Sequence, residues 1–132
     1  MPSTSVVYPS HRLVVTSCSE GVTLDEVRIS AAQIRDHPEF RPHFRQLIDL
    51  NRATSIHLHF KELYELKHVH DPFSNESKRA VVAAADASYG VSRMYQLILN
   101  TPYFEVFRSL PEAAQWLEVD LSFLENELHS TH

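Results

Sequence analysis

The chain has 132 residues, 43% of them hydrophobic and 22% charged, and a formal net charge of −5 with the histidines neutral. This length fits one domain with a real core, and the acidic balance disfavours nucleic-acid binding, which needs a basic face. Because no apolar run reaches the roughly 18 residues of a membrane helix, no signal-peptide pattern opens the chain and Cys18 is the single cysteine, we expect a cytoplasmic protein without membrane insertion.

The first third of the chain predicts two strands and a helix. Val6–Tyr8 and Arg12–Cys18 are rich in β-branched residues, and Pro9-Ser10 between them indicates a tight turn. Thr23 and Glu26 have the spacing of a capping box, so a helix is expected to follow Thr23.

The middle of the chain predicts two more strands with a helix between them. Gln46–Asp49 is typical of a central strand, and a polar turn and a helix over about 58–67 follow it. Arg79–Ala84 is a continuous apolar run, as expected for a strand buried on both faces. The side chains expected to face inward from the helix are Phe60, Leu63, Tyr64 and Leu66.

The last third predicts a helix, a short strand, a second helix and a tail. Asp86–Ser88 offers an N-cap for the first helix, and Tyr103–Phe107 is the strand. Ser109 and Glu112 form a second capping-box pattern. Removing the hydroxyl of Thr23 or Ser109 is expected to cost about 1 kcal/mol each. The side chains expected on the apolar face of the first helix are Val91, Met94, Tyr95 and Ile98.

Strands that alternate with helices predict an α/β sandwich: a mixed, mostly parallel sheet of about five strands with four helices. Residues 1–119 would form this domain, and residues 120–132 an amphipathic C-terminal tail. The tail is more apolar than a free terminus needs, which favours a homodimer in which it covers a partner subunit.

Four segments carry a resemblance to the STAS-like superfamily, named for sulfate transporters and anti-sigma-factor antagonists. They are RLVVTSCSEGVTLDEV, LIDLNRATSIHLHFKEL, RAVVAAADASYGVSRMYQ and VFRSLPEAAQWLEV. More narrowly, the chain resembles small bacterial STAS-like proteins of unknown function. The resemblance implies a STAS-like two-layer sandwich.

In the switching members of that superfamily, a serine at a helix N-terminus is phosphorylated by a partner kinase. The corresponding motif falls on residues 57–60, His-Leu-His-Phe, which contain no hydroxyl. Thr54 and Ser55 precede the motif at the wrong offset. We therefore predict no phosphoserine switch of that type. CRAL-TRIO lipid-binding domains share a related architecture, which leaves an apolar ligand open by analogy.

The strongest ligand-site candidate is the segment that follows the strand at 79–84. Such loops bind ligands where the strand order of an open α/β sheet reverses, and the amides at a helix N-terminus attract anions. The candidate residues are Asp86, Ser88, Tyr89, Gly90 and Arg93, with His57. The alternative is structural: Asp86 or Ser88 caps the helix, Gly90 eases close packing and Arg93 pairs with a surface acid.

Metal and catalytic sites find less support. His57 and His59 could share one face of a strand, but His68 and His70 lie beyond a helix roughly 15 Å long, so we predict no metal site and no cofactor. Cys18 would need a positioned base to act as a nucleophile, and a buried structural thiol is favoured.

The sequence thus favours a non-catalytic regulatory or small-ligand-binding domain, for an anionic or apolar ligand. Two alternatives stay open: a protein-interaction module, and an enzyme with an unrecognised site. A pocket lined by Tyr89, Arg93, His57 and apolar residues would favour ligand binding, whereas an exposed apolar patch without a pocket would favour the interaction module.

Overall fold

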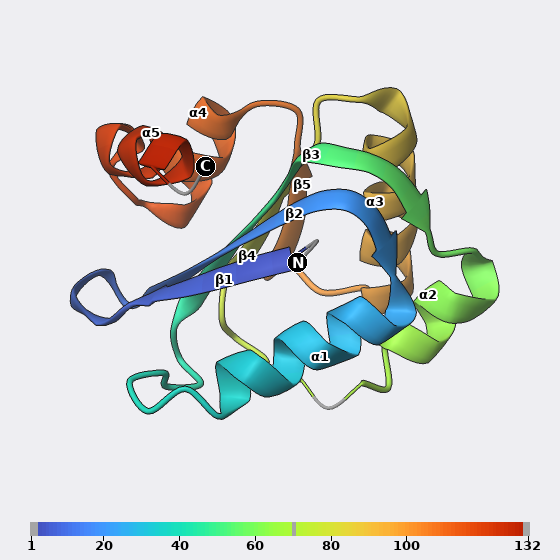
Figure 1. Ribbon diagram of the computed structural model, residues 1–132, viewed down its shortest axis with the longest axis horizontal. Coiled ribbons are helices and arrows are strands. Elements are labelled where there is room, and N and C mark those ends of the chain that lie inside the picture. Colours follow the sequence, from blue (N-terminus) through green and yellow to red (C-terminus); the bar gives the residue numbers. More distant parts are fainter. Residues whose placement is uncertain (1–2, 70, 131–132) are drawn as a thin grey trace.

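A single five-stranded sheet organises the protein in the computed structural model, which describes residues 3–69 and 71–130 (Figure 1). The strands lie in the order β1-β2-β3-β4-β5; β1 is antiparallel to β2, and the other neighbours are parallel. The strands are β1 (Ser3–Tyr8), β2 (Leu13–Thr23), β3 (Arg45–His57), β4 (Arg79–Val82) and β5 (Phe104–Phe107). The predicted mixed, mostly parallel α/β sheet is confirmed.

In the described part of the chain, five α-helices accompany the sheet, one more than predicted, because the C-terminal segment forms a helix of its own. They are α1 (Leu24–Arg35), α2 (Phe60–Leu66), α3 (Asp86–Leu99), α4 (Leu110–Leu117) and α5 (Leu121–Ser130), and a short 3-10 helix, η1 (Pro9–His11), replaces the predicted turn between β1 and β2. None of the helices in residues 3–69 and 71–130 has the length and apolar character needed to cross a membrane.

The helices cover both faces of the sheet (Figure 1). Each parallel strand is added at the same edge, so crossovers of one hand place their helices on one face. That face is covered by α1, α2 and α3, and α4 and α5 cover the opposite one.

The α4/α5 face holds a closely packed core. Leu47 of β3, Leu117 of α4 and Leu124 of α5 are each at most 1% exposed and belong to one hydrophobic cluster. Two further contacts join helix α5 to the end of β1 and to η1. The Tyr8 hydroxyl donates to Glu127 at 2.9 Å, and the Phe123 ring stacks on His11 with 3.8 Å between ring centroids. The predicted apolar tail therefore packs on its own domain.

The predicted N-cap positions are right at Thr23 and Ser109 and wrong at the start of α3. Thr23 caps α1, accepting the Glu26 amide at 3.3 Å. Ser109 occupies the N-cap position of α4, but its hydroxyl donates to the Glu112 carboxylate at 2.8 Å and bonds no backbone amide. The predicted cap by Asp86 or Ser88 is wrong, because α3 already begins at Asp86 and its N-cap residue is Ala85.

Several predicted boundaries are too short. The segment 50–57, predicted as a polar turn, continues β3 instead, because its backbone pairs with β2 as far as His57. β2 likewise runs to Thr23 rather than Cys18, with irregular register after Ser17 and Glu20. Backbone pairing with a neighbouring strand decides strand length here, although side chains such as Arg52 point into solvent.

Two predicted apolar faces are partly wrong. In α2, Leu63 is buried at 1% exposure, but Phe60 and Tyr64 are 62% and 52% exposed. Leu63 and Leu66 form the side that meets the domain, so the two aromatic rings lie off that stripe. In α3, Val91, Tyr95 and Ile98 pack on the core as predicted, whereas Met94 is 41% exposed.

Candidate functional site

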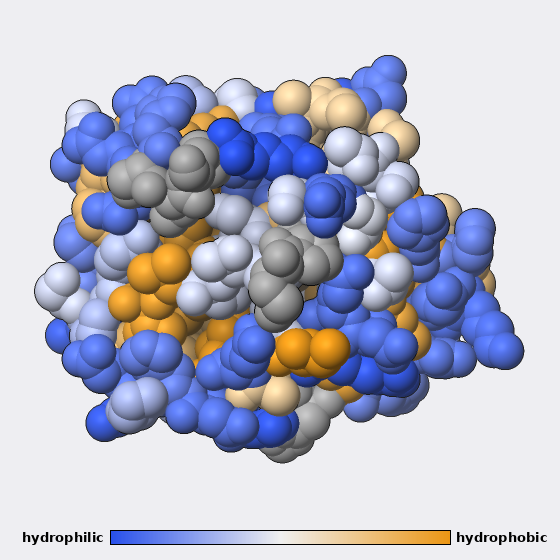
Figure 2. Space-filling view, in the orientation of Figure 1, coloured by the Kyte–Doolittle hydropathy of each residue, from blue (hydrophilic) through white to orange (hydrophobic). Residues whose placement is uncertain are grey.

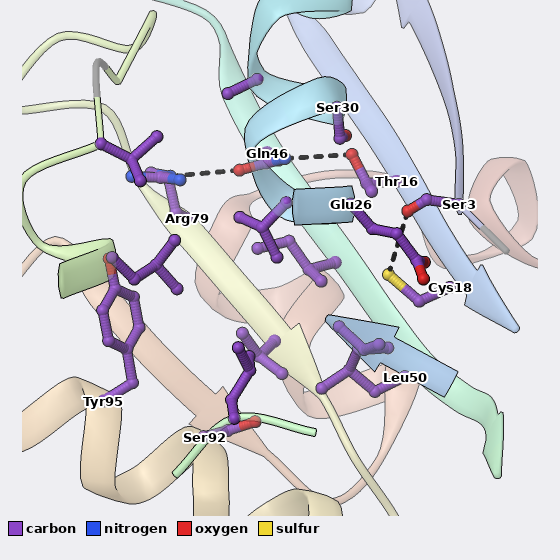
Figure 3. Close-up of a pocket in the computed structure, with 18 of the residues that line it drawn as sticks. Ser3, Thr16, Cys18, Glu26, Ser30, Gln46, Leu50, Arg79, Ser92 and Tyr95 are labelled. Carbon is purple, nitrogen blue, oxygen red and sulfur yellow. Dashed lines mark hydrogen bonds between the residues drawn. The ribbon is translucent and has the colours of Figure 1, made fainter. Parts of the chain in front are cut away.

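An internal pocket lies between the sheet and the helices α1, α2 and α3. Its volume is about 160 Å³, comparable to apolar cavities of about 150 Å³ that hold a benzene-sized molecule. Most of its lining side chains are aliphatic or aromatic and come from every layer around it. The apolar lining includes Val22, Val27, Ala31, Ile34, Ile48, Leu50, Leu63, Val81, Val91 and Phe104. We call this space the inner pocket (Figure 3).

Small residues on two helices explain why the space is not filled. Ser30 and Ala31 of α1 and Ser92 of α3 line the pocket, at positions where longer side chains would reach into it. In addition, α2 has only seven residues and so covers a short part of the sheet. The pocket therefore follows from residue size and helix length on this face.

A row of hydrogen-bonded polar side chains crosses the sheet along this pocket (Figure 3). Arg79 Nε donates to Gln46 Oε1 at 3.1 Å, and Gln46 Nε2 donates to Thr16 Oγ1 at 3.0 Å. The row continues from Thr16 to Ser5 at 2.9 Å and from Ser5 to Ser30 of α1 at 3.3 Å. Since Thr16 and Gln46 are each 5% exposed, their mutual bonds offset the desolvation of buried polar groups.

Arg79 ends this row and is held on several sides. Its Nη1 pairs with Asp71, and its guanidinium lies 5.0 Å from the ring centroid of Phe73 and 6.0 Å from that of Phe104. Cation–π contacts and charge-assisted bonds both favour this position. A positive group thus stands at one end of a mainly apolar pocket, paired with Asp71.

Tyr95 of α3 also faces the pocket, and its hydroxyl points toward the Arg79 side in Figure 3. Burial raises the pKa of Tyr95 to about 12; Arg79 opposes this shift and Asp71 adds to it. The hydroxyl therefore keeps its proton at neutral pH. Within residues 3–69 and 71–130, no hydrogen-bond partner of this hydroxyl is found.

Cys18 lines the other end of the pocket near Ser3, at 3.7 Å between Sγ and Oγ. Burial raises the pKa of this thiol, and a protonated thiol is a poor nucleophile. Cys18 is 7% exposed, as predicted for a buried structural thiol.

The predicted ligand residues at the start of α3 lie apart from the inner pocket. Asp86 pairs with Arg108 at 2.7 Å, and the Arg108 guanidinium lies 3.9 Å from the ring centroid of Tyr89. The Ser88 hydroxyl donates to the Ala85 carbonyl at 3.2 Å. Asp86 and Tyr89 thus both contact Arg108, whereas Ser88 bonds the backbone just before α3.

The other predicted residues point elsewhere. Arg93 lies 3.9 Å from Glu105 and is 45% exposed, and a Cβ added at Gly90 would have no neighbour within 4 Å. His57 bonds Ser55 at 3.0 Å at the end of β3. The strand order runs from β1 to β5 without reversal, so the switch point on which this site prediction rested is absent from the described sheet.

The histidine pairs do not gather into a metal site in the described residues, where no group of three or more His, Cys, Asp or Glu side chains has suitable geometry. His70, a member of the second pair, lies outside the described residues. In the segment 57–60, the Glu62 carboxylate accepts a hydrogen bond from the His59 backbone amide at 3.1 Å. A negatively charged side chain is therefore already bound at the N-terminus of α2.

Sequence reasoning missed the inner pocket, because its lining residues are spread over all five strands and three helices. One signal was available. Thr16, Gln46 and Arg79 are polar residues inside otherwise apolar strand segments, and such residues must find partners when buried.

No protein-family model matches the chain, and no curated protein matches it. Among solved structures, it is similar to an uncharacterized protein from the DUF3478 family with a SpoIIAA-like fold, from Shewanella loihica PV-4. The two share 17% identity with a TM-score of 0.51, over 87% of this chain and 91% of that one. The protein therefore has a SpoIIAA-like, that is STAS-like, fold.

Proposed function

We propose that this protein is a non-catalytic domain that binds a small, largely apolar ligand in the inner pocket and acts through that binding as a regulatory module. The observation that carries the proposal is a pocket of about 160 Å³ with mainly apolar lining and a few polar groups at its ends. Ligand sites in proteins share this composition. A cytoplasmic location is part of the proposal, because the single cysteine is a free, buried thiol.

A non-catalytic role is supported by the chemistry of the pocket. The protonated Cys18 thiol contacts the Ser3 hydroxyl rather than a base, whereas an activated nucleophile needs a base within hydrogen-bond reach. Regulation would not use the phosphoserine mechanism, since residues 57–60 contain no hydroxyl. Stoichiometric phosphate on Thr54, Ser55, His57 or His59, found by mass spectrometry of protein from its native host, would contradict this part.

Two neighbouring alanines of α1 provide a matched test of the pocket. Ala31 lines it and Ala32 does not. Ala31→Leu should fill the space and weaken the binding of toluene, an apolar probe of suitable size, at least tenfold. Ala32→Leu should leave toluene binding close to that of the wild type. Calorimetric titration gives the affinities, and a ligand present at 100 times its Kd stabilises the fold by about 2.7 kcal/mol, which thermal melts detect.

Two outcomes would overturn the proposal. The first is that wild-type protein binds neither toluene nor indole in titration or melts. The second is that both alanine variants bind toluene as well as the wild type does, which would place the binding elsewhere.

The exposed aromatic pair of α2 favours a second candidate, the protein-interaction module. Phe60 and Tyr64 are 62% and 52% exposed, with ring centroids 6.4 Å apart. On the face shown in Figure 2, however, hydrophobic areas are interrupted by hydrophilic side chains. The homodimer predicted from the apolar tail would form through α2 in this candidate, because the tail packs on its own domain. If it is right, light scattering should find a dimer for wild-type protein and a monomer for the Phe60→Ser/Tyr64→Ser double variant.

A further inference from the structure

At the Arg79 end of the inner pocket, some donors have no hydrogen-bond partner, whereas most acceptors have one. Arg79 donates from Nε to Gln46 and pairs through Nη1 with Asp71. A guanidinium has further N–H donors beyond these two. The Tyr95 hydroxyl is protonated at neutral pH and has no partner in the described residues. Unused donors therefore remain on both side chains.

The acceptors at the same end are already engaged. Asp71 accepts the Phe73 amide on Oδ1 at 3.0 Å and pairs with Arg79 through Oδ2. The Gln46 side-chain oxygen accepts from Arg79. A ligand that enters this end meets N–H and O–H donors that no other side chain engages, and apart from the Tyr95 hydroxyl its acceptors are already bonded, which favours a ligand with an acceptor of its own.

Charge decides which acceptor fits best. Hydrogen bonds from a guanidinium to a carboxylate are roughly twice as strong as bonds between neutral groups. The Asp71 side chain, which pairs with Arg79, is 44% exposed, so solvent screens its repulsion of a second anion. Glu26 lines the pocket near Cys18, at the opposite end in Figure 3, and its charge disfavours an anion there.

We propose that the ligand of the inner pocket is a small monocarboxylate with an apolar body, whose carboxylate is bound by Arg79 and the Tyr95 hydroxyl. This inference rests on the proposed ligand-binding function and adds the ligand's chemical class and orientation. The apolar body lies among the aliphatic side chains of α1 and β3, toward Ala31 and Ile48. The pocket volume of about 160 Å³ suits a single ring or a short chain.

Three probes separate the possibilities: toluene has no polar group, and the two larger probes, which match each other in size, are phenylacetone with a neutral acceptor and phenylacetate with the carboxylate. Calorimetric titration of wild-type protein at pH 7 should show phenylacetate binding at least ten times more tightly than phenylacetone. Equal or weaker binding of phenylacetate, with toluene still bound, would overturn the carboxylate inference and leave the proposed function standing. Binding of none of the three would overturn the proposed function itself.

Variants locate the carboxylate. Tyr95→Phe removes only the unpartnered hydroxyl and should weaken phenylacetate binding about tenfold, the usual order for one hydrogen bond to a charged group, with toluene binding unchanged. Tyr89→Phe, on the same helix but outside the pocket, should change neither. Arg79→Lys keeps the charge but loses the planar donor geometry and should also weaken phenylacetate selectively. Phenylacetate selectivity that survives both Tyr95→Phe and Arg79→Lys would refute the proposed binding mode.

Discussion

The two faces of the sheet are built from the same five strands but are covered in different ways. On the α4/α5 face, large side chains such as Leu47 and Leu124 are fully buried in one cluster. On the α1–α3 face, small helix residues leave the inner pocket, and a polar row runs beside it. The difference indicates that stability is concentrated on the first face, whereas the second face has room for a ligand. Predictions that set one face against the other test this division.

The largest expected contrast lies within β3. Leu47 faces α4 and α5 at 0% exposure, and Leu50 lines the inner pocket on the other side. Leu47→Ala should lower the free energy of unfolding by about 2–5 kcal/mol, because it opens a cavity in a filled core. Leu50→Ala should cost about half as much or less, since the space beside it is already open. Urea denaturation measures both, and equal losses would mean that the two faces of β3 are equally well packed.

The polar row should contribute the next largest effect. Gln46→Met removes the partner of the Arg79 Nε and one of the two side-chain partners of Thr16, which keeps its bond to Ser5, so a loss of about 1–3 kcal/mol is expected. Adding Thr16→Val should cost less than the sum of the single changes, because the two residues share a bond. Gln33→Met, at an exposed position of α1, is the control and should stay within about 0.5 kcal/mol of wild type. Strict additivity in the double variant would mean that the row is not a coupled network.

Two tyrosines, one on each face of the sheet, differ in whether their hydroxyl has a hydrogen-bond partner. Tyr8 donates to Glu127 on the α4/α5 face, so Tyr8→Phe should cost about 1 kcal/mol. The Tyr95 hydroxyl has no hydrogen-bond partner in the described residues, and Tyr95→Phe should change stability by less than about 0.5 kcal/mol. Thermal melts at neutral pH, without ligand, measure both changes. A larger loss for Tyr95 would show that its hydroxyl has a structural partner.

The same tyrosines give a pH prediction. Burial raises the pKa of Tyr8 and of Tyr95 to about 12 from the ordinary 10.0, and the Glu127 bond adds to the shift of Tyr8. Because the folded protein favours the neutral phenols, their stabilisation is complete below pH 10 and is lost as the pH rises toward 12. In an ultraviolet titration, each of the two Phe variants should show one fewer phenol with a raised pKa than the wild type does.

The smallest contrast concerns the helix starts on the two faces. Thr23→Ala removes an oxygen that accepts a backbone amide of α1 and should cost about 1 kcal/mol. Ser109→Ala removes only a side-chain bond to Glu112 at the start of α4, so a few tenths of a kcal/mol is expected, below the value predicted from sequence. The denaturation midpoints of the two variants measure these losses. A loss for Ser109→Ala equal to that for Thr23→Ala would mean that the Ser109 hydroxyl caps the helix in solution.

Local chemistry predicted the fold well wherever the pattern and the tertiary structure agree. The β-branched run around Val14, the apolar run at Val81 and the cap at Thr23 each led to the observed element. The predictions failed where pairing with an adjacent strand determines where an element ends. Strand β3 extends to His57 because β2 offers it backbone partners, which the polar sequence of that segment does not reveal.

The inner pocket was less predictable, because a pocket is defined by what side chains leave empty. Ala31 and Ser92 are small residues in two separate helices, and nothing in either helix alone shows that they face the same space. The row from Arg79 to Thr16 likewise depends on strand register, which determines which residues of adjacent strands lie side by side. Composition indicates that such buried polar residues need partners but not which ones.

The strand order described above also bears on how the chain acquires its structure. Each strand pairs with the strand before it in the sequence, so the sheet can be extended by one strand at a time from the N-terminus. Helices α4 and α5, which seal the filled face, come last. During synthesis, when N-terminal parts fold first, that face stays open until residues 110–130 have been made. Chains that stop before residue 110 would expose Leu47 and its neighbours and should aggregate.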